Sequence, residues 1–268
     1  MKRIRTISMI LLAVVIAASM AANFLAPAPY AKQFREAPNS APTRQHLLGT
    51  DALGRDRLSR VLYGTRISLL LAPAAALLST LLAAAIGATA GFIGGRTQRL
   101  AMAATDLFLS LPWLFLLITV RALLPLNVSP ATSVIVTFAL LGVLGWAASA
   151  RVVCAGAAAI RDSEWVLQAR ASGIYGARLL FRQVVPNLKP VLLAQFWVSI
   201  PVFILSEANL GILGLGVAEP LPSWGSLLRE LNEFVSFSGE PWKFAPLLLL
   251  FLVVTSFQLL LSRNEVTA

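Results

Sequence analysis

Histidine and cysteine are nearly absent from this sequence, which contains one residue of each, His46 and Cys154, among 268. A metal cluster built from several histidines is therefore excluded. Cys154 has no second cysteine with which to form an internal disulfide, and one thiol without a nearby histidine is not a metal site. The sequence predicts no metal site and no resident cofactor.

Charged residues are also scarce, at 13% of the chain, whereas about 25% is typical of soluble globular domains. Hydrophobic residues make up 57% and occur in long blocks. A helix needs about 20 mostly apolar residues to cross the bilayer core, where no water can satisfy a bare backbone. The sequence therefore predicts an all-α, polytopic membrane protein.

No phosphate-binding loop of the Gly-x-x-x-x-Gly-Lys-Ser/Thr type occurs in the chain. Residues 91–96 supply glycines but no lysine followed by a hydroxyl residue. Any ATP that drives this protein must be bound by a separate subunit.

The formal net charge is +10, which could indicate nucleic-acid binding. The 22 basic residues, however, flank the apolar blocks and do not gather in one soluble region. Positive charge beside membrane segments is the usual signal of membrane topology, so no nucleic-acid partner is predicted.

Six apolar segments are long enough to span a bilayer, at about residues 8–27, 67–94, 101–124, 130–155, 190–214 and 244–262. The first follows a basic N-terminus and also resembles a secretory signal peptide with a cleavage site near Ala21 and Ala22. Its length of about 20 residues favours a retained helix. Six spans, the first starting in the cytoplasm, place both termini in the cytoplasm.

The charges of the loops mostly agree with this orientation. Basic residues mark the predicted cytoplasmic turn 95–99 and loop 156–190, and acidic residues mark the predicted outer loop 215–243. The stretch 28–66 is rich in arginine although the count places it outside. We predict three regions: 1–66 (cytoplasmic tip, first span and outer segment), 67–262 (membrane core with a cytoplasmic loop at about 156–190) and 263–268 (cytoplasmic tail).

The cytoplasmic loop contains the clearest helix signals. Ser163 is a good N-cap, Glu164 suits the first turn of a helix, and Gly173 is a natural helix end. A second helical stretch, about 174–185, is predicted to end at Pro186. A short helix pair of this kind suits docking to another protein, and an ordinary interfacial connector is the alternative.

Two carboxylates, Asp106 and Glu207, fall within or near apolar spans, where charged groups are costly and often functional. They are candidates for lining a path or for pairing across a subunit interface. Capping a broken helix, or a place near the membrane surface, is the alternative. Arg121 and Arg151 lie near span ends, where we expect them to snorkel to the headgroups.

The cytoplasmic loop resembles the "EAA" loop of ABC importer permeases, which ends in glycine and is followed by Pro-Asn about a dozen residues later. The matching residues are Ala169, Arg170, Ala171, Gly173, Pro186 and Asn187. Five further stretches narrow the resemblance to the second, or C-type, permease of the dipeptide, oligopeptide and nickel family. They are Leu48–Asp56 with Gly49, Thr50, Asp51, Gly54, Arg55 and Asp56; Asp106 with Pro112; Gly145–Arg151; Glu207–Val217; and Pro222–Gly225.

The resemblance implies a type I ABC importer permease fold and no enzymatic activity of its own. It also implies a second homologous permease subunit, two cytoplasmic ABC ATPase subunits that carry ATP and Mg²⁺, and an extracytoplasmic substrate-binding protein. The substrate would be a dipeptide, an oligopeptide or a related solute such as nickel. The location would be the bacterial inner membrane, and the coupling loop, with Glu164, Gln168, Ala169, Arg170, Gly173 and Pro186, would meet the ATPase.

Two departures from the family pattern concern this contact. The family's glutamate aligns with Leu167 and the alanine after it with Gln168, and the usual glycine-aspartate ending is missing from residues 261–265. A weakened or specialised ATPase contact stays open.

Two other classes of function compete with the importer. A secondary transporter or channel driven by an ion gradient would need no ATPase, but it would usually show internal repeats, which the sequence lacks. A membrane-embedded enzyme would need a catalytic set, and His46 with the two scattered carboxylates Asp106 and Glu207 does not form a recognisable one.

Overall fold

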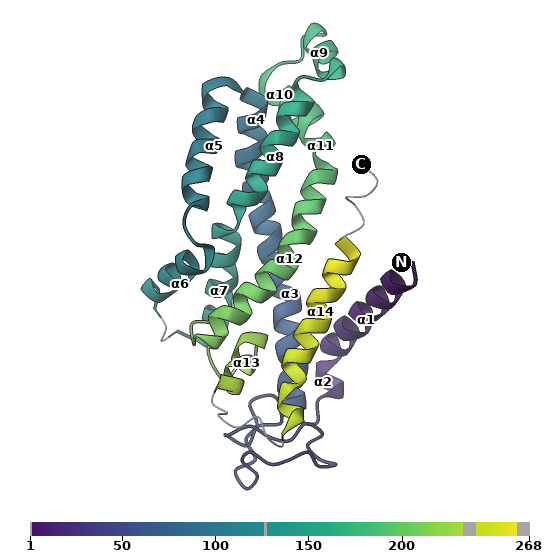
Figure 1. Cartoon of the computed structure of the whole chain (residues 1–268), viewed down its shortest axis with the longest axis vertical. Coiled ribbons are helices and arrows are strands. Elements are labelled where there is room, and N and C mark those ends of the chain that lie inside the picture. Colours follow the sequence, from purple (N-terminus) through teal and green to yellow (C-terminus); the bar gives the residue numbers. More distant parts are fainter. Residues whose placement is uncertain (1, 126–127, 233–239, 262–268) are drawn as a thin grey trace. The chain divides into compact units, whose positions relative to one another are not determined.

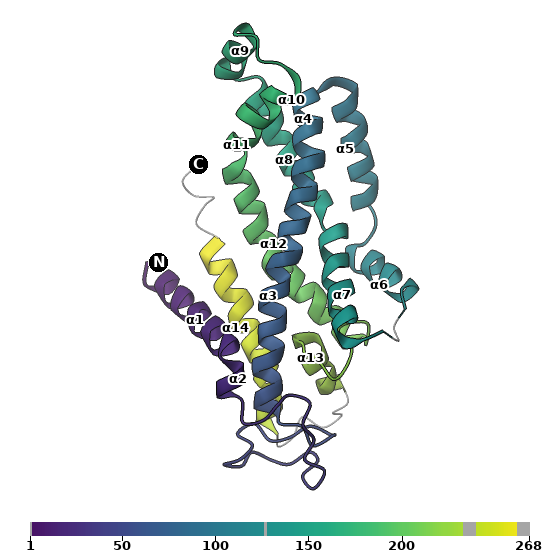
Figure 2. The same cartoon turned by 180° about the vertical axis from the view of Figure 1, so that it is seen from behind.

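The structure of the protein, a computed structural model, describes residues 2–125, 128–232 and 240–261 (Figures 1 and 2). Among these residues no β-strand forms, and two isolated bridges, Gln33–Arg55 and Thr50–Asp56, lie in a non-helical segment. The predicted all-α class is confirmed. The predicted tail 263–268 lies outside the described residues.

Five helical stretches of the described chain are long and apolar enough to cross a membrane. They are Arg3–Met20, Arg57–Ile93, Pro130–Arg161, Lys189–Ile212 and Pro241–Leu261. A sixth span exists if α5 (Gly95–Leu109) and α6 (Trp113–Leu123), which meet at 80°, are counted together. The predicted span over 101–124 is therefore broken between α5 and α6, because the residue before Pro112 is disfavoured in a helix. The second span begins at Arg57, ten residues before the predicted apolar start at 67.

The described chain forms two compact units. One contains residues 1–72, 121–138 and 201–268, and the other contains residues 73–120 and 139–200. Two of the boundaries fall at prolines inside helices, Pro73 in α3 (Arg57–Ala83) and Pro201 in α12 (Lys189–Ile212). Proline removes one backbone hydrogen bond of its helix, so both helices are weakened where one unit ends. The division by membrane side at residues 66 and 262 stays a prediction.

In the first unit, α1 (Lys2–Met20) packs along α14 (Ala245–Leu261), and Figures 1 and 2 both show the pair side by side. A short helix, α2 (Ala22–Leu25), follows α1. A 3-10 turn (Pro241–Phe244) leads into α14, against which α13 (Trp224–Asn232) packs. The segment between α2 and α3, residues 26–56, contains no helix.

In the second unit, α8 (Trp146–Arg161) packs closely against a π-helical turn (Ala84–Ala88) and α4 (Thr89–Ile93). Two glycines make this approach possible. A Cβ at Gly87 would overlap the carbonyl oxygen of Ala150, and one at Gly91 would overlap that of Cys154. Small residues permit such close helix packing within membranes.

The same unit contains α7 (Pro130–Leu144) in part and the cytoplasmic-loop helices of the sequence prediction. These are α9 (Glu164–Ala171), α10 (Gly176–Leu179), a π-helical turn (Leu180–Val184) and α11 (Val185–Asn187). The second predicted stretch does not end at Pro186, which lies in the first turn of α11. Proline is tolerated there because the first N–H groups of a helix have no intrahelical partner. In this second unit, Leu180, Val184 and Leu188 form a buried core with Val153 and Ala157 of α8.

The packing of α4 on α8 predicts the effect of one methyl group. Gly91→Ala should lower the free energy of unfolding by about 1–3 kcal/mol through overpacking, since the new Cβ would also lie 2.8 Å from the Cβ of Ala157. Gly156→Ala is the matched control, because its Cβ would meet only the flexible ends of Leu188 and Val191. Thermal unfolding in detergent measures both variants, and equal stability of the two would contradict the packing argument.

Candidate functional site

The non-helical segment 26–56 depends on two glycines with left-handed backbone. Gly49 has φ of 68° and Gly54 has φ of 75°. A Cβ at Gly49 would overlap the carbonyl oxygen of Ser40, and one at Gly54 would overlap that of Phe34. These two motif residues are therefore required by the shape of the loop.

Asp51 organises the turn between these glycines. Its Oδ1 accepts the N–H groups of Leu53 and Arg55 at 2.9 and 2.8 Å, and its Oδ2 accepts Nε of Arg55 at 2.6 Å. The hydroxyl of the neighbouring Thr50 accepts the N–H of Ser40 at 2.9 Å. Both side chains are buried, so these motif residues fold the loop.

Asp56 joins the loop to α3. Its Oδ1 accepts the N–H of Ser59 at 2.7 Å, which is the hydrogen bond of a helix N-cap. Its Oδ2 lies 2.8 Å from Nδ1 of His46. The only histidine of the chain thus serves as a partner of the capping carboxylate.

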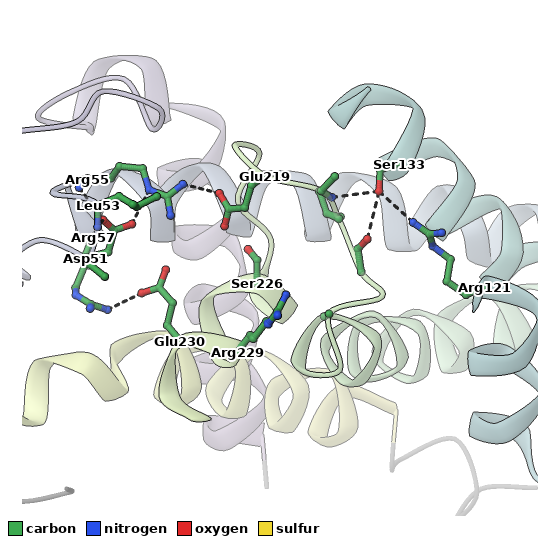
Figure 3. A pocket seen from close by; sticks show the side chains of 16 residues that line it. Asp51, Leu53, Arg55, Arg57, Arg121, Ser133, Glu219, Ser226, Arg229 and Glu230 are labelled. Atoms are coloured by element: carbon green, nitrogen blue, oxygen red, sulfur yellow. Dashed lines mark hydrogen bonds and ion pairs between the residues drawn. The ribbon is translucent and has the colours of Figure 1, made fainter. Parts of the chain in front are cut away.

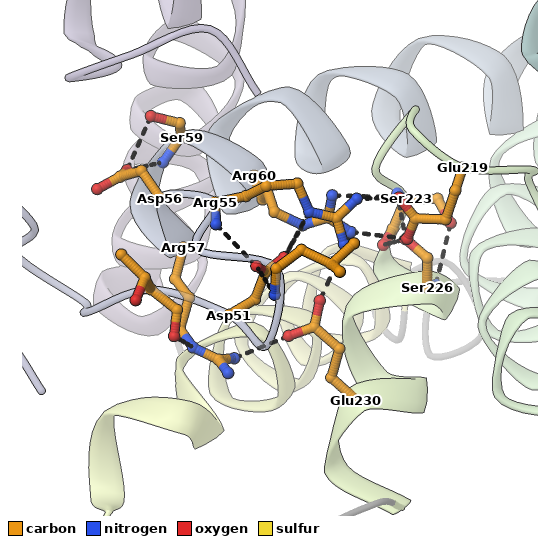
Figure 4. Close-up of polar contacts among 12 residues, drawn as sticks. Asp51, Arg55, Asp56, Arg57, Ser59, Arg60, Glu219, Ser223, Ser226 and Glu230 are labelled. Carbon is orange, nitrogen blue, oxygen red and sulfur yellow. Dashed lines mark hydrogen bonds and ion pairs between the residues drawn. The ribbon is translucent and has the colours of Figure 1, made fainter. Parts of the chain in front are cut away.

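Two arginines, Arg55 just before α3 and Arg60 in its first turn, form ion pairs with Glu219, more than 150 residues away (Figure 4). Arg55 Nη1 lies 2.5 Å from Oε2 of Glu219, and Arg60 Nη2 lies 2.9 Å from Oε1. Burial acts to lower the pKa of Arg55, but the hydrogen bond to Asp51 and the charge of Glu219 outweigh it, and the pKa is raised.

A second carboxylate, Glu230 of α13, completes the cluster. Arg57 Nη1 lies 2.8 Å from Oε2 of Glu230, and Arg60 Nη2 lies 3.5 Å from Oε1. Burial raises the pKa of Glu230, and the charges of Arg57 and Arg60 oppose the rise. Arg60 is fully buried and also lies 3.6 Å from Oδ2 of Asp51. We call these six residues the arginine–carboxylate cluster: Asp51, Arg55, Arg57, Arg60, Glu219 and Glu230.

A cavity of about 460 Å³ opens beside this cluster, within the first unit (Figure 3). Five of the six cluster residues line one part of it. Other lining residues come from α13 and from the loop that follows α12, and they include Ser226, Arg229, Gly214 and Gly216. Its volume is in the range of small-molecule sites, about 300–1,000 Å³.

Arg121 of α6 also lines this cavity and does not snorkel, contrary to the sequence expectation. The side chain is buried, with 1% of the residue exposed. Its Nη2 donates to Oγ of Ser133 at 3.4 Å, whereas Nε and Nη1 have no hydrogen-bond partner among the described residues. The position near a span end gave no signal of this burial, which comes from distant parts of the chain.

Glu207 does not line the cavity. It is fully buried in α12, where Oε2 accepts the hydroxyl of Ser68 at 3.3 Å. A Cβ at Gly225 would lie 2.9 Å from Oε1 of Glu207 and 2.7 Å from the Cα of Gly211. Two stretches of the predicted family pattern, Glu207–Val217 and Pro222–Gly225, thus meet here, and a role of Glu207 in a path or an interface stays a prediction.

Asp106 of α5 forms an ion pair with Arg151 of α8. Both side chains are more than half exposed, at 56% and 53%. Arg151 is thus held by a carboxylate within the second unit, and its snorkelling to the headgroups stays a prediction. The pair is a charged feature on an outer face of that unit, and its role in a path or an interface stays a prediction.

The predicted docking helix, α9, begins directly after Ser163, as expected. The hydroxyl of Ser163, however, donates to the carbonyl of Ile160 at 2.6 Å and does not cap the helix. At the other end Gly173 has φ of 82°. Its N–H donates to the carbonyl of Arg170 at 2.9 Å, and the N–H of Ile174 donates to that of Ala169 at 3.1 Å, which is a Schellman motif.

α9 presents a mixed surface. Glu164 and Gln168 are exposed, as are Trp165 and Leu167 at 40% and 52%, while Val166 is buried. Ala169 and Arg170 are half-buried. The helix is therefore anchored by Val166 and leaves most of its surface free for a partner.

Known proteins resemble this chain over most of its length. Residues 83–264 match the family of binding-protein-dependent transport system inner membrane components. The oligopeptide transport system permease protein OppC of Bacillus subtilis is 34% identical over 202 residues, which are 75% of this chain and 64% of that protein. The dipeptide transport system permease protein DppC of the same species is 32% identical over 238 residues, 88% of this chain and 72% of that protein.

A third relative extends the range of named solutes. The glutathione transport system permease protein GsiD of Pectobacterium atrosepticum is 32% identical over 222 residues, 83% of this chain and 71% of that protein. The chain spans slightly less than two thirds of the length of the first of these relatives. The resemblance drawn from the sequence motifs is confirmed by these matches.

The arginine–carboxylate cluster predicts a strong effect of its central residue. Arg60→Met should lower the free energy of unfolding by about 3–5 kcal/mol, because Asp51 and Glu230, whose side chains are largely buried, would lose the cation that they share. Arg66→Met, on the same helix, should cost less than about 1 kcal/mol, since the one polar contact of Arg66 within the described part of the chain is exposed, at 3.4 Å from Asn23. Thermal unfolding in detergent compares the two, and equal losses would show that the cluster does not stabilise the fold.

Proposed function

The chain belongs to the family of binding-protein-dependent transport system inner membrane components, and we propose that it is a permease subunit of an ABC importer for peptides. The observation that carries this proposal is the match over residues 83–264, which includes α9, together with relatives named as peptide permeases. The chain itself is a multi-pass membrane protein. ATP would be hydrolysed by other subunits, because the chain lacks a phosphate-binding loop.

The proposed assembly has four kinds of subunit. This chain would pair with a second, homologous permease, and two ABC ATPase subunits would bind ATP and Mg²⁺ on the cytoplasmic side. A substrate-binding protein would deliver the solute from outside. In the proposed orientation, within a bacterial inner membrane, both termini and α9 lie in the cytoplasm.

The geometry of α9 supports a role in coupling. The Schellman motif fixes the direction of the chain after α9, and Val166 anchors the helix to the rest of its unit. Closure of the ATPase pair would press on α9, and the attached helices would then move. A ligand shifts such an equilibrium only by binding one state better than the other, so ATP and the loaded binding protein would both favour the outward-open state.

Purification of the full chain from its native membrane tests the proposal. An ABC ATPase and a second permease should accompany it, and the complex in vesicles should take up dipeptides only with ATP. Uptake that follows an ion gradient in the absence of any ATPase would instead establish the secondary-transporter alternative.

Gly173 offers a specific test of coupling. Gly173→Val should abolish ATPase association or uptake, because a β-branched residue cannot readily adopt φ of 82° and the end of α9 would change its course. Gly95→Val is the matched control, since Gly95 also has positive φ, at 58°, and both positions have open space around a Cβ. Normal uptake by Gly173→Val at normal expression would count heavily against this role of α9.

A further inference from the structure

The cavity beside the arginine–carboxylate cluster contains two arginines that the cluster does not use. Arg55 and Arg57 of the lining are paired with Asp51, Glu219 and Glu230. Arg121 and Arg229 line the same cavity, and neither has a carboxylate partner among the residues the structure describes. The lining thus carries four arginines and three carboxylates, and the excess positive charge lies at Arg121 and Arg229.

Arg121 is the more unusual of the two. A guanidinium that is 99% buried needs a hydrogen-bond acceptor for each N–H, because the loss of water is costly. Here Nε and Nη1 have none, and the one contact, to Ser133 Oγ, is long at 3.4 Å. That hydroxyl already donates to the carbonyl of Gly216 at 3.2 Å and accepts the N–H of Ala218 at 3.1 Å. Ser133 therefore has one lone pair left, which accepts a single N–H of Arg121 and leaves the rest of the guanidinium unsatisfied.

Arg229 lies against the same loop. A Cβ at Gly214 would be 2.9 Å from Nη1 of Arg229, so the guanidinium occupies the space that glycine leaves. In the view of Figure 3, Arg57 and Asp51 lie at one side of the cavity, Arg121 and Ser133 lie at the other, and Arg229 lies between them. The loop 214–219 thus positions both free arginines, through Ser133 on one side and Gly214 on the other.

We propose that this cavity binds the carboxylate of a transported solute, with Arg121 and Arg229 as the groups that receive it. Guanidinium groups bind carboxylates with short, charge-assisted and often bidentate hydrogen bonds, which would satisfy the free N–H groups of Arg121. The volume of about 460 Å³ accommodates a solute of dipeptide size. That the solute is a peptide rests on the proposed function, whereas the preference for a carboxylate rests on the cavity itself.

Binding of simple probes to the purified full chain, with whichever subunits accompany it and without the binding protein, tests the site. Calorimetric titration should show that dialanine binds about tenfold more tightly than dialanine amide, which lacks the carboxylate. Arg229→Gln should remove most of this preference while leaving the fold intact, because the side chain is exposed. Arg99→Gln, which removes one exposed arginine that is not part of the cavity lining, should keep the wild-type preference.

Arg121→Lys keeps a cation in the buried position but removes the guanidinium fork, and it should also reduce the preference. The proposal is overturned if dialanine and its amide bind equally, or if neither binds. It is also overturned if Arg229→Gln and Arg121→Lys both retain the wild-type preference. Binding of inorganic phosphate in place of dialanine would identify a site for inorganic anions and would likewise refute it.

The same preparation separates this proposal from the proposed function. If the chain discriminates dialanine from its amide but has no ATPase partner, the carboxylate site stands and the importer assignment fails. A chain that co-purifies with an ATPase and takes up dipeptides with ATP, but does not discriminate the two probes, retains the importer assignment and loses the site.

Discussion

Ion pairs between buried arginines near the start of α3 and two distant carboxylates, Glu219 and Glu230, hold the first unit together. Arg60 has no exposed surface, and it is surrounded by Asp51, Glu219 and Glu230. Such a group is tolerated only when its partners are fixed around it. The non-helical segment 26–56 is held by hydrogen bonds between its own residues, such as Phe34 N–H to the Gly54 carbonyl at 2.8 Å, and its turn depends on Asp51 and on the glycines beside it. The cavity exists because this segment and the loop 214–219 are brought to the same place.

Arginine has two different environments in this unit, and the difference gives the cavity lining an excess of positive charge. Arginines 55, 57 and 60 reside among carboxylates and are electrically neutralised. Arg121 and Arg229 lie beside glycines and beside a hydroxyl that accepts a single N–H of Arg121. Glycine at 214 and 216 removes side chains that would fill the space next to them. A chain that is sparing with charge therefore keeps two cations at one cavity without a carboxylate among its described residues, and for the buried Arg121 this is costly unless an anion joins it.

Sequence patterns predicted those parts of the structure that depend on neighbouring residues. Apolar length predicted the membrane helices, and Glu164 with Gly173 predicted both ends of α9. The motif glycines and Asp51 were found from a resemblance, and the structure shows that local loop geometry requires them. Arg121 could not be predicted, because its burial depends on Ser133 and on a loop some 90 residues further along the chain. The bend at Pro112 and the position of Pro186 inside a helix were also missed. Proline can end one helix and begin another, so its presence alone does not decide between the two.

The surface of α9 bears on how such a helix can hold a partner when the family's glutamate is replaced by Leu167. An exposed ion pair contributes about 0–1 kcal/mol, and salt weakens it. Burial of apolar surface contributes about 25 cal/mol per Å² and does not depend on charge. Trp165 and Leu167 expose 40% and 52% of their surface, close to Glu164 along the helix. In the proposed assembly the contact of α9 with an ATPase would therefore rest on apolar area more than on charge. In that assembly the replacement of glutamate would change the kind of contact and would not by itself weaken the coupling.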